Sequence, residues 1–367
     1  MLLRAALLSL LTTLSLVAPA PAHAADPVVS TAPPTVSGEA VVGRVVRASP
    51  GTWSPAEVTV TYRWLRGDRP IPGATSPAYR VVPDDLGSPL AVRATATDAD
   101  GHSAVATSAP TGPVARGVLV SRRPPAVTGT RRYGRTVAAT TGRWSVPPRV
   151  ATYQWLRGAR PIPGATKRRH TFAPQDVGRR VRVRVTVRAH GYEPATAVSA
   201  RTGTVGHRVG VRRTVTYHVE TRGRITTSLK DFRRLAQQTY DDPRGWRAKG
   251  VRFVRVARGG SFTLVLAEAS RVPAFSPICS SEWSCRVGRF VVINQTRWKN
   301  ASPAWNRARG ALRGYRHMVV NHETGHWLGK GHAGCPGPGR LAPVMMQQSK
   351  GLAGCRFNPW PTAGELR

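Results

Sequence analysis

Two segments of the chain repeat each other with a period of 91 residues, and this repetition constrains the fold more than any other feature. The shared blocks are Gly51-Thr-Trp53 with Gly142-Arg-Trp144, Tyr62-Arg-Trp64-Leu-Arg-Gly67 with Tyr153-Gln-Trp155-Leu-Arg-Gly158, Pro70-Ile-Pro-Gly-Ala-Thr75 with Pro161-Ile-Pro-Gly-Ala-Thr166, and Asp85-Leu-Gly87 with Asp176-Val-Gly178. Because the units of solenoid proteins are shorter than this, self-similarity at such a period indicates two tandem domains.

Within each copy the sequence alternates in the manner of β-strands. Residues Thr59–Leu65 and Val181–Val187 alternate with period two, and clusters of Pro, Gly and Asp separate such runs. Short strands around a central Trp predict an all-β, immunoglobulin-like sandwich for each copy, held by packing alone because neither contains a cysteine. Both copies resemble the Ig-like repeats with W-L-R-G and P-I-P-G-A-T blocks in secreted and surface proteins of actinobacteria. A spacer is the simplest role, and carrier or wall-binding roles stay open.

The first residues have the pattern of a secretory signal peptide. Met1-Leu-Leu-Arg4 is followed by an apolar run, Ala5–Val17, and then by Ala22-His23-Ala24. A positive start, a short apolar run and an A-x-A site predict cleavage after Ala24. The run is too short to span a bilayer and no other segment approaches that length, so we expect no transmembrane segment. The mature protein is expected to be secreted or associated with the cell wall.

The chain is strongly basic, with a formal net charge of +37 at pH 7. Such a charge attracts anionic polymers, which predicts anionic cell-wall polymers as partners. Six of the 55 basic residues are Lys, and the arginines are spread along the chain, as a GC-rich coding bias would also produce. Both interpretations stay open. No nucleic-acid motif accompanies the charge, so a nucleic-acid partner is not expected. The sequence does not predict an oligomeric state.

The four cysteines all lie in the C-terminal part of the chain. An even count in an exported protein predicts two disulfides, for which three connectivities exist. We predict the pairing that is local in sequence, Cys279 with Cys285 and Cys335 with Cys355. A metal site built from all four thiolates is disfavoured because no C-x-x-C pair is present.

The C-terminal part mixes strands with helices. Four runs predict strands, Thr214–Glu220, Val251–Val256, Phe262–Ala267 and Phe290–Asn294, and two runs predict helices, Leu229–Tyr240 and about Ala311–Leu328. This mixture predicts an α+β domain. We therefore expect a multidomain chain with a signal peptide at 1–24, Ig-like repeats at 25–116 and 117–206, and an α+β domain at 207–367.

The second predicted helix carries the pattern H-E-x-x-H-x-x-G-x-x-H, formed by His322, Glu323, His326, Gly329 and His332. Histidines four residues apart lie on the same face of a helix, as a shared metal ion requires. A glycine after the helix allows a sharp turn that could bring the third histidine back as a ligand. Glutamate one position further round the helix suits a base next to the ion.

The apolar stripe of the same helix leads directly into this pattern. Leu312, Tyr315 and Val319 continue at helical spacing into His322 and His326, so both imidazoles are expected to face the domain interior. Three neutral imidazoles leave one coordination position free, which is typical of a catalytic rather than a structural zinc site. The sequence therefore predicts one catalytic Zn²⁺, with Glu323 as general base for a zinc-activated water that attacks an amide bond.

The motif and its surroundings resemble a known family. Tyr315–Cys335, Ala342–Ser349 and Gly354–Trp360 resemble the actinobacterial, zincin-like family DUF3152, and the histidine motif with a Met downstream resembles the metzincin clan of zinc metallopeptidases. The resemblance implies a metzincin-like fold, with His322, His326 and His332 as zinc ligands and Glu323 as base. It also implies that Met345 is the Met-turn residue, in preference to Met346. Some metzincins add a Tyr ligand two residues later, where this chain has Gln347.

These observations predict a secreted zinc-dependent metalloendopeptidase that acts on protein or peptide substrates. Two alternatives remain: a zinc amidase that acts on peptidoglycan peptides, and a non-catalytic cell-wall adhesion protein that uses the zincin fold as a scaffold. His317 lies off the ligand stripe and is expected to be an exposed helix residue. Substrate specificity, a latency mechanism and any ligand of the repeats are not predicted by the sequence.

Overall fold

The computed structural model describes residues 27–367, so the predicted signal peptide at 1–24 lies outside the described residues. Contacts divide the chain into two units, one extending to Leu119 together with Ala189–Pro194, and one comprising Val120–Arg188 with Ala195–Arg367. No helix among the described residues is long and apolar enough to cross a membrane.

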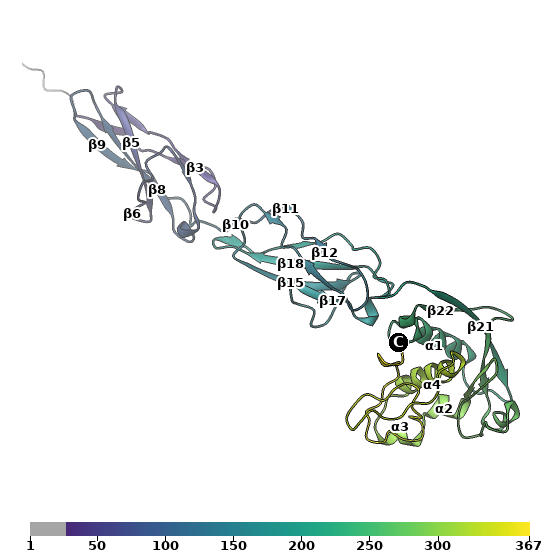
Figure 1. The fold of residues 1–367 in the computed structure, drawn as a ribbon. Helices are drawn as coiled ribbons and strands as arrows, with labels where there is room; N and C mark the ends of the chain where they lie inside the picture. Colours follow the sequence, from purple (N-terminus) through teal and green to yellow (C-terminus); the bar gives the residue numbers. More distant parts are fainter. Residues whose placement is uncertain (1–26) are drawn as a thin grey trace, which may run out of the picture. The chain divides into compact units, whose positions relative to one another are not determined.

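The first repeat forms a β-sandwich, as the sequence predicts (Figure 1). Its larger sheet has the order β6-β5-β8-β9, and the facing sheet has the order β2-β3-β7, while β1 pairs with β4. The strands are β1 (Val29–Ala32), β2 (Val36–Ser37), β3 (Val45–Ala48), β4 (Thr52–Ser54), β5 (Thr59–Arg66), β6 (Arg69–Pro70), β7 (Ala78–Arg80), β8 (Leu90–Thr97) and β9 (Ser103–Thr107). Short β10 (Gly117–Val118) pairs in parallel with β19 (Tyr192–Glu193).

The second repeat has the same strand pairing. The sheet β16-β15-β18-β20 faces the sheet β12-β13-β17, and β11 pairs with β14. The strands are β11 (Ser121–Arg123), β12 (Val127–Thr128), β13 (Thr136–Ala139), β14 (Arg143–Trp144), β15 (Val150–Arg157), β16 (Arg160–Pro161), β17 (Arg169–Thr171), β18 (Val181–Arg188) and β20 (Ala195–Val198). In β18 every second side chain, all of them Val, is buried, which accounts for the period-two alternation of its sequence.

The repeated residues hold each sandwich together. Trp64 and Trp155 are fully buried, and burying each side chain contributes on the order of 1.5–3 kcal/mol. A buried carboxylate is bound in the same way in each copy. Asp85 accepts hydrogen bonds from Arg66 Nε (2.7 Å), Tyr79 Oη (2.9 Å) and Val82 N (2.8 Å), and Asp176 accepts them from Arg157 Nε (2.8 Å), His170 Nε2 (3.0 Å) and Ala173 N (2.8 Å).

The C-terminal part contains a five-stranded sheet in the order β22-β21-β23-β25-β24. Its strands are β21 (Arg213–Arg222), β22 (Val251–Arg255), β23 (Phe262–Ala267), β24 (Cys285–Val287) and β25 (Phe290–Asn294). All pairs are parallel except the edge pair, in which β24 runs antiparallel to β25. The central strand β23 is buried at every position, which is typical of a strand covered on both faces.

Four helices accompany this sheet: α1 (Leu229–Asp241), α2 (Gln295–Asn300), α3 (Pro303–Arg307) and α4 (Leu312–Trp327). Helix α1 packs against α4 (Figure 1). Both helices bury apolar side chains in one core with β21, β22, β23 and β25. The opposite face of β23 and β25 is covered by the segment that contains Val272, Phe275 and Cys279. The predicted strands and both long helices are therefore present, and α4 is the element that carries the histidine motif.

Candidate metal centre

Helix α4 presents the first two histidines of the motif toward the interior of the domain. Tyr315 and Val319, one and two turns earlier on the same stripe, are buried in the core. His322 is buried and His326 is half-buried. The stripe predicted from helical periodicity therefore exists, and it brings both imidazoles to one side of the helix.

The glycine of the motif ends the helix as the sequence predicts. Gly329 has φ +85°, a left-handed conformation that side chains with a Cβ rarely adopt. Its amide bonds to the carbonyl of His326 at 3.1 Å, and the next amide, of Lys330, bonds back to the carbonyl of Gly325 at 2.9 Å. This reversal of the chain places His332 opposite the helix.

The three histidine side chains converge on one point. Nε2 of His326 lies 3.1 Å from Nε2 of His322 and 3.1 Å from Nε2 of His332. Among the described residues these imidazoles form one of two groups whose potential ligand atoms lie within 4.8 Å of one another; the other group is Asp98, Asp100 and His102.

Backbone carbonyls fix the tautomers of the two helical histidines. Nδ1 of His322 donates to the carbonyl oxygen of Val344 at 2.8 Å, and Nδ1 of His326 donates to that of Lys330 at 2.9 Å. A neutral imidazole has a single N–H, so Nε2 of each carries a lone pair. Two lone pairs at 3.1 Å repel each other unless a cation lies between them.

The electrostatic environment keeps these histidines neutral. Burial lowers the pKa of His322 to about 3. Burial is also the main cause that lowers the pKa of His326 and of His332, and the charges of Arg286 on the former and Lys350 on the latter act in the same direction. Because metals bind the neutral imidazole, the lowered pKa values favour the protonation state that metal binding requires.

The spacing of the nitrogens fits zinc. Zinc binds imidazole nitrogen at about 2.0–2.1 Å in tetrahedral geometry, which places two ligand nitrogens about 3.3 Å apart. The observed separations of 3.1 Å are close to this value. The backbone hydrogen bonds at Nδ1 are the kind of outer contact that orients metal-binding histidines. The donor set therefore suits a zinc ion bound by His322, His326 and His332.

Glu323 lies next to this point but is not one of the converging groups. Its side chain is buried, and burial raises the pKa of its carboxyl to about 8. It lines the same cleft as the three histidines. A carboxyl with this placement can exchange a proton with a group bound in the cleft, and it ionises more readily beside a bound cation.

Met345 packs directly under the motif. It is buried, and an added Cβ on Gly325 would lie 2.8 Å from the ring of Trp246 and closer still to the Met345 sulfur. The helix must therefore have no side chain at Gly325. Met346 lies instead in a separate small cluster with Cys335 and Cys355. Met345 is thus the methionine beneath the histidines, and the glycine inside the H-E-T-G-H sequence is a requirement that sequence analysis missed.

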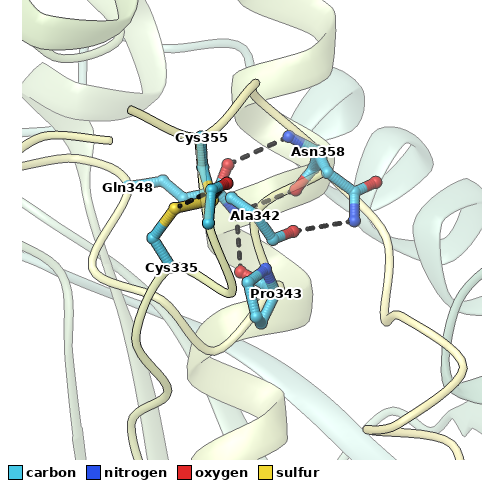
Figure 2. Close-up of a disulfide and its surroundings, with 7 residues drawn as sticks. Cys335, Ala342, Pro343, Gln348, Cys355 and Asn358 are labelled. Carbon is cyan, nitrogen blue, oxygen red and sulfur yellow. Dashed lines mark hydrogen bonds between the residues drawn. A yellow bond between two sulfur atoms is a disulfide. The ribbon is translucent and has the colours of Figure 1, made fainter. Parts of the chain in front are cut away.

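A hydrogen-bond network holds the turn that contains Met345 (Figure 2). The buried Gln348 side chain donates to the carbonyls of Pro343 (3.0 Å) and Asn358 (2.8 Å), and its Oε1 accepts from the amide of Asn358 (3.0 Å). The Asn358 side chain donates to the carbonyl of Ala342 at 2.9 Å. The blocks Ala342–Ser349 and Gly354–Trp360 are therefore two sides of one structure around the turn.

Glu365, close to the C-terminus, binds the same turn from the other side. Its carboxylate oxygens accept hydrogen bonds from the amides of Val344 (3.0 Å) and Met345 (2.7 Å), and from the amide of Thr362 (2.7 Å). Since the carbonyl of Val344 orients His322, Glu365 acts on the metal site through the backbone. No local sequence spacing links Glu365 to the turn, so sequence analysis missed it.

Two disulfides frame the site, with the pairing that the sequence predicts. Cys279–Cys285 links the segment that covers the sheet to the edge strand β24. Cys335–Cys355 joins the chain after His332 to the segment beyond the Met345 turn (Figure 2). Both are consistent with an extracellular location, where disulfides persist.

The three histidines open into a cleft of about 560 Å³. One wall comes from the Cys279–Cys285 segment and β24, and the other comes from α4 and the residues after it. Gln347, at the position where some metzincins have a Tyr ligand, is exposed in this cleft. A cleft of this size accommodates a segment of a peptide or a similar ligand.

One expectation about α4 is wrong. His317 is not an exposed helix residue, because Nδ1 lies 2.9 Å from the hydroxyl of Thr239 and its ring packs against Trp360 at 4.5 Å between centroids. Helix α1 and the C-terminal segment cover this flank of α4, which helical periodicity alone does not show.

Comparison with known proteins assigns one domain. Residues 185–360 match the family model described as "Protein of unknown function (DUF3152)", so the chain contains a DUF3152 domain that begins within β18. No curated protein matches the chain.

Solved structures resemble the chain only weakly. Three N-terminal domains of the outer capsid protein Hoc of bacteriophage RB49 are 13% identical over 53% of this chain and 65% of that one, with a TM-score of 0.22. This chain thus spans less than two thirds of that protein. The tandem Ig repeats of Dlar are 16% identical over 47% and 96% (TM-score 0.16), and murine CEACAM1b is 12% identical over 46% and 96% (TM-score 0.21).

Proposed function

We propose that this protein is a secreted, zinc-dependent metallopeptidase of the metzincin type, in which residues 207–367 form a zincin-like catalytic domain. The observation that carries the proposal is the convergence of His322, His326 and His332, with Nε2 of His326 3.1 Å from Nε2 of each of the other two. Backbone carbonyls accept the Nδ1–H groups of His322 and His326, so the Nε2 lone pairs of these two residues face each other, and a shared cation relieves their repulsion.

The chemistry divides between the ion and the chain. His322, His326 and His332 would hold a zinc ion, which would supply Lewis-acid chemistry, namely polarisation of a carbonyl group and a lower pKa for water. Glu323 takes the proton from the attacking water and delivers it to the leaving amine. Burial shields that carboxyl from bulk solvent and raises its pKa, whereas a cation bound beside it would favour the ionised form that accepts a proton. The cleft walls hold the extended substrate across this point.

Zinc content and hydrolysis, measured together on the full-length protein, test the proposal. Wild type and Glu323→Gln are purified, analysed for zinc, and incubated with mixed peptides and with purified cell wall. The proposal predicts equal zinc in both and hydrolysis by the wild type alone. Equal hydrolysis by Glu323→Gln would remove Glu323 from the mechanism. Zinc with no hydrolysis of either substrate would favour a non-catalytic adhesion protein, and cleavage of cell wall alone would favour a peptidoglycan amidase.

A further inference from the structure

The cleft in front of the histidines is positively charged. Of the residues that line it, three are cationic, namely Arg286, Lys330 and Lys350, whereas Glu323 is the single acidic one. No described carboxylate lies within ion-pair distance of the three cations, although elsewhere other arginines do form ion pairs. The cleft therefore carries positive charge that the protein itself does not neutralise.

Arg286 differs from an ordinary surface arginine in its position. It lies on the edge strand β24 directly opposite Val291 of β25, and residues paired in this way point to the same face of a sheet. Val291 belongs to the core beneath α4, whereas Cys285 and Val292 face the opposite side. The register thus directs Arg286 toward α4 and the histidines.

The guanidinium of Arg286 lacks partners there. Its Nε atom is buried, and no described residue accepts a hydrogen bond from it. A buried donor on a charged group without an acceptor is costly, and the cost is offset when an anion binds. Arginine is suited to such a role because its planar donors match the two oxygens of a carboxylate.

We propose that Arg286, supported by the charge of Lys350, forms a subsite for a carboxylate of the substrate next to the bond that is cleaved. This inference rests on the proposed peptidase function and narrows it to acidic peptides. The carboxylate can belong to an internal acidic side chain or to the C-terminus of the peptide. The first source makes the enzyme an endopeptidase with a preference for acidic residues, and the second makes it a carboxypeptidase.

The test uses the zinc-loaded full-length protein and short quenched-fluorescence peptides. The peptides of one set differ only by Glu, Gln or Lys at a single position, and successive sets place this residue at successive positions along the peptide. Each peptide is prepared with a free and with an amidated C-terminus. We expect kcat/KM to favour Glu over Gln, or the free over the amidated terminus, by about tenfold or more, the effect of one charge-assisted hydrogen bond. The arm that shows the effect identifies the source of the carboxylate.

Variants connect the preference to the subsite. Arg286→Gln should abolish the preference, so that kcat/KM becomes about equal for the Glu and Gln peptides or for the free and amidated peptides. Arg286→Glu should instead favour the Lys peptide. Arg307→Gln, an exposed arginine at the end of α3 and outside the cleft, is the matched control and should keep it. If Arg286→Gln fails to fold, Arg286→Lys retains the charge without the planar donors and should reduce the preference only in part. A wild type with no preference, or an Arg286→Gln variant that keeps it, overturns the subsite.

Binding separates this inference from the peptidase proposal. If the wild type cleaves no peptide, the affinities of the same Glu and Gln peptides for the full-length protein are compared by calorimetry. Tighter binding of the acidic peptide that disappears in Arg286→Gln supports the subsite although peptidase activity is refuted. Equal affinity for both peptides overturns the subsite as well.

Discussion

Replacing Gly325 by Ala tests the close packing between α4 and the Met345 turn. The added methyl group would lie 2.8 Å from the ring of Trp246 and closer still to the sulfur of Met345. The Trp246 ring cannot move away easily, because it is buried and its Nε1 donates to the carbonyl of Asn321 at 2.9 Å.

The expected cost follows from two opposing terms. Overpacking a buried site costs about 1–3 kcal/mol, whereas Gly to Ala inside a helix gains up to about 1 kcal/mol in propensity. We therefore expect a net destabilisation of about 1–2 kcal/mol, with displacement of Met345 and weaker zinc binding. Gly314→Ala is the control in the same helix, because its nearest atom, in Trp305, is 3.3 Å away and needs only a small adjustment.

Calorimetry of the full-length protein provides the assay. The transition of the C-terminal domain is expected to be the one that shifts when zinc is added, since a ligand that binds only the folded state stabilises it. Gly325→Ala should lower this transition while Gly314→Ala leaves it unchanged or raises it. Adding Met345→Ala should recover part of the loss from Gly325→Ala, which a double-mutant cycle measures. A Gly325→Ala protein as stable as the wild type would refute the packing argument.

Three further outcomes are expected. The space around Gly329 is open, so Gly329→Ala should destabilise the domain through left-handed backbone strain alone, by roughly 1–2 kcal/mol. Gly329→Asn should cost less, because Asn adopts this conformation more readily than Ala. Thermal unfolding measures both. Glu365→Gln should weaken zinc binding by roughly 10–100-fold, since the residues that orient metal ligands tune affinity on that scale. Competition with a chelator measures the affinity, and an unchanged affinity would show that the carboxylate has no positioning role. Burial lowers the pKa of His317 to about 4, against about 6.5 in the unfolded chain. Between these pH values the unfolded state binds one more proton, so the free energy of unfolding falls as the pH drops from 6.5 toward 4, by at most roughly 3 kcal/mol. His317→Gln should reduce this loss of stability in denaturation measured against pH, and an unchanged pH dependence would contradict the burial of a neutral His317.

The sequence predicts those parts of the structure that rest on short-range patterns. Both sandwiches follow from the repeated blocks around Trp64 and Trp155, since alternation and a central aromatic residue are sufficient for a core. The helix that carries the histidines follows from its apolar stripe, and Gly329 ends it as expected. Each of these features depends on side chains a few residues apart.

Other parts depend on contacts between distant segments. Strand β24 has three residues and its pairing with β25 cannot be recognised by periodicity, yet it places Arg286 in the cleft. The carboxylate of Glu365 finds backbone amides twenty and twenty-one residues earlier, where no side chain signals the contact. His317 is covered by Trp360, a neighbour that the helix sequence does not show.

Zinc stoichiometry of the full-length protein tests the central claim most directly. Purified wild type, Glu323→Gln and His326→Ala are incubated with zinc, freed of excess metal, and analysed for zinc per chain. The account predicts one tightly held zinc ion in the wild type and in Glu323→Gln, and its loss in His326→Ala, because His326 lies within 3.1 Å of both other imidazole nitrogens. A wild type that retains no zinc, or a His326→Ala protein that retains as much as the wild type, would contradict it.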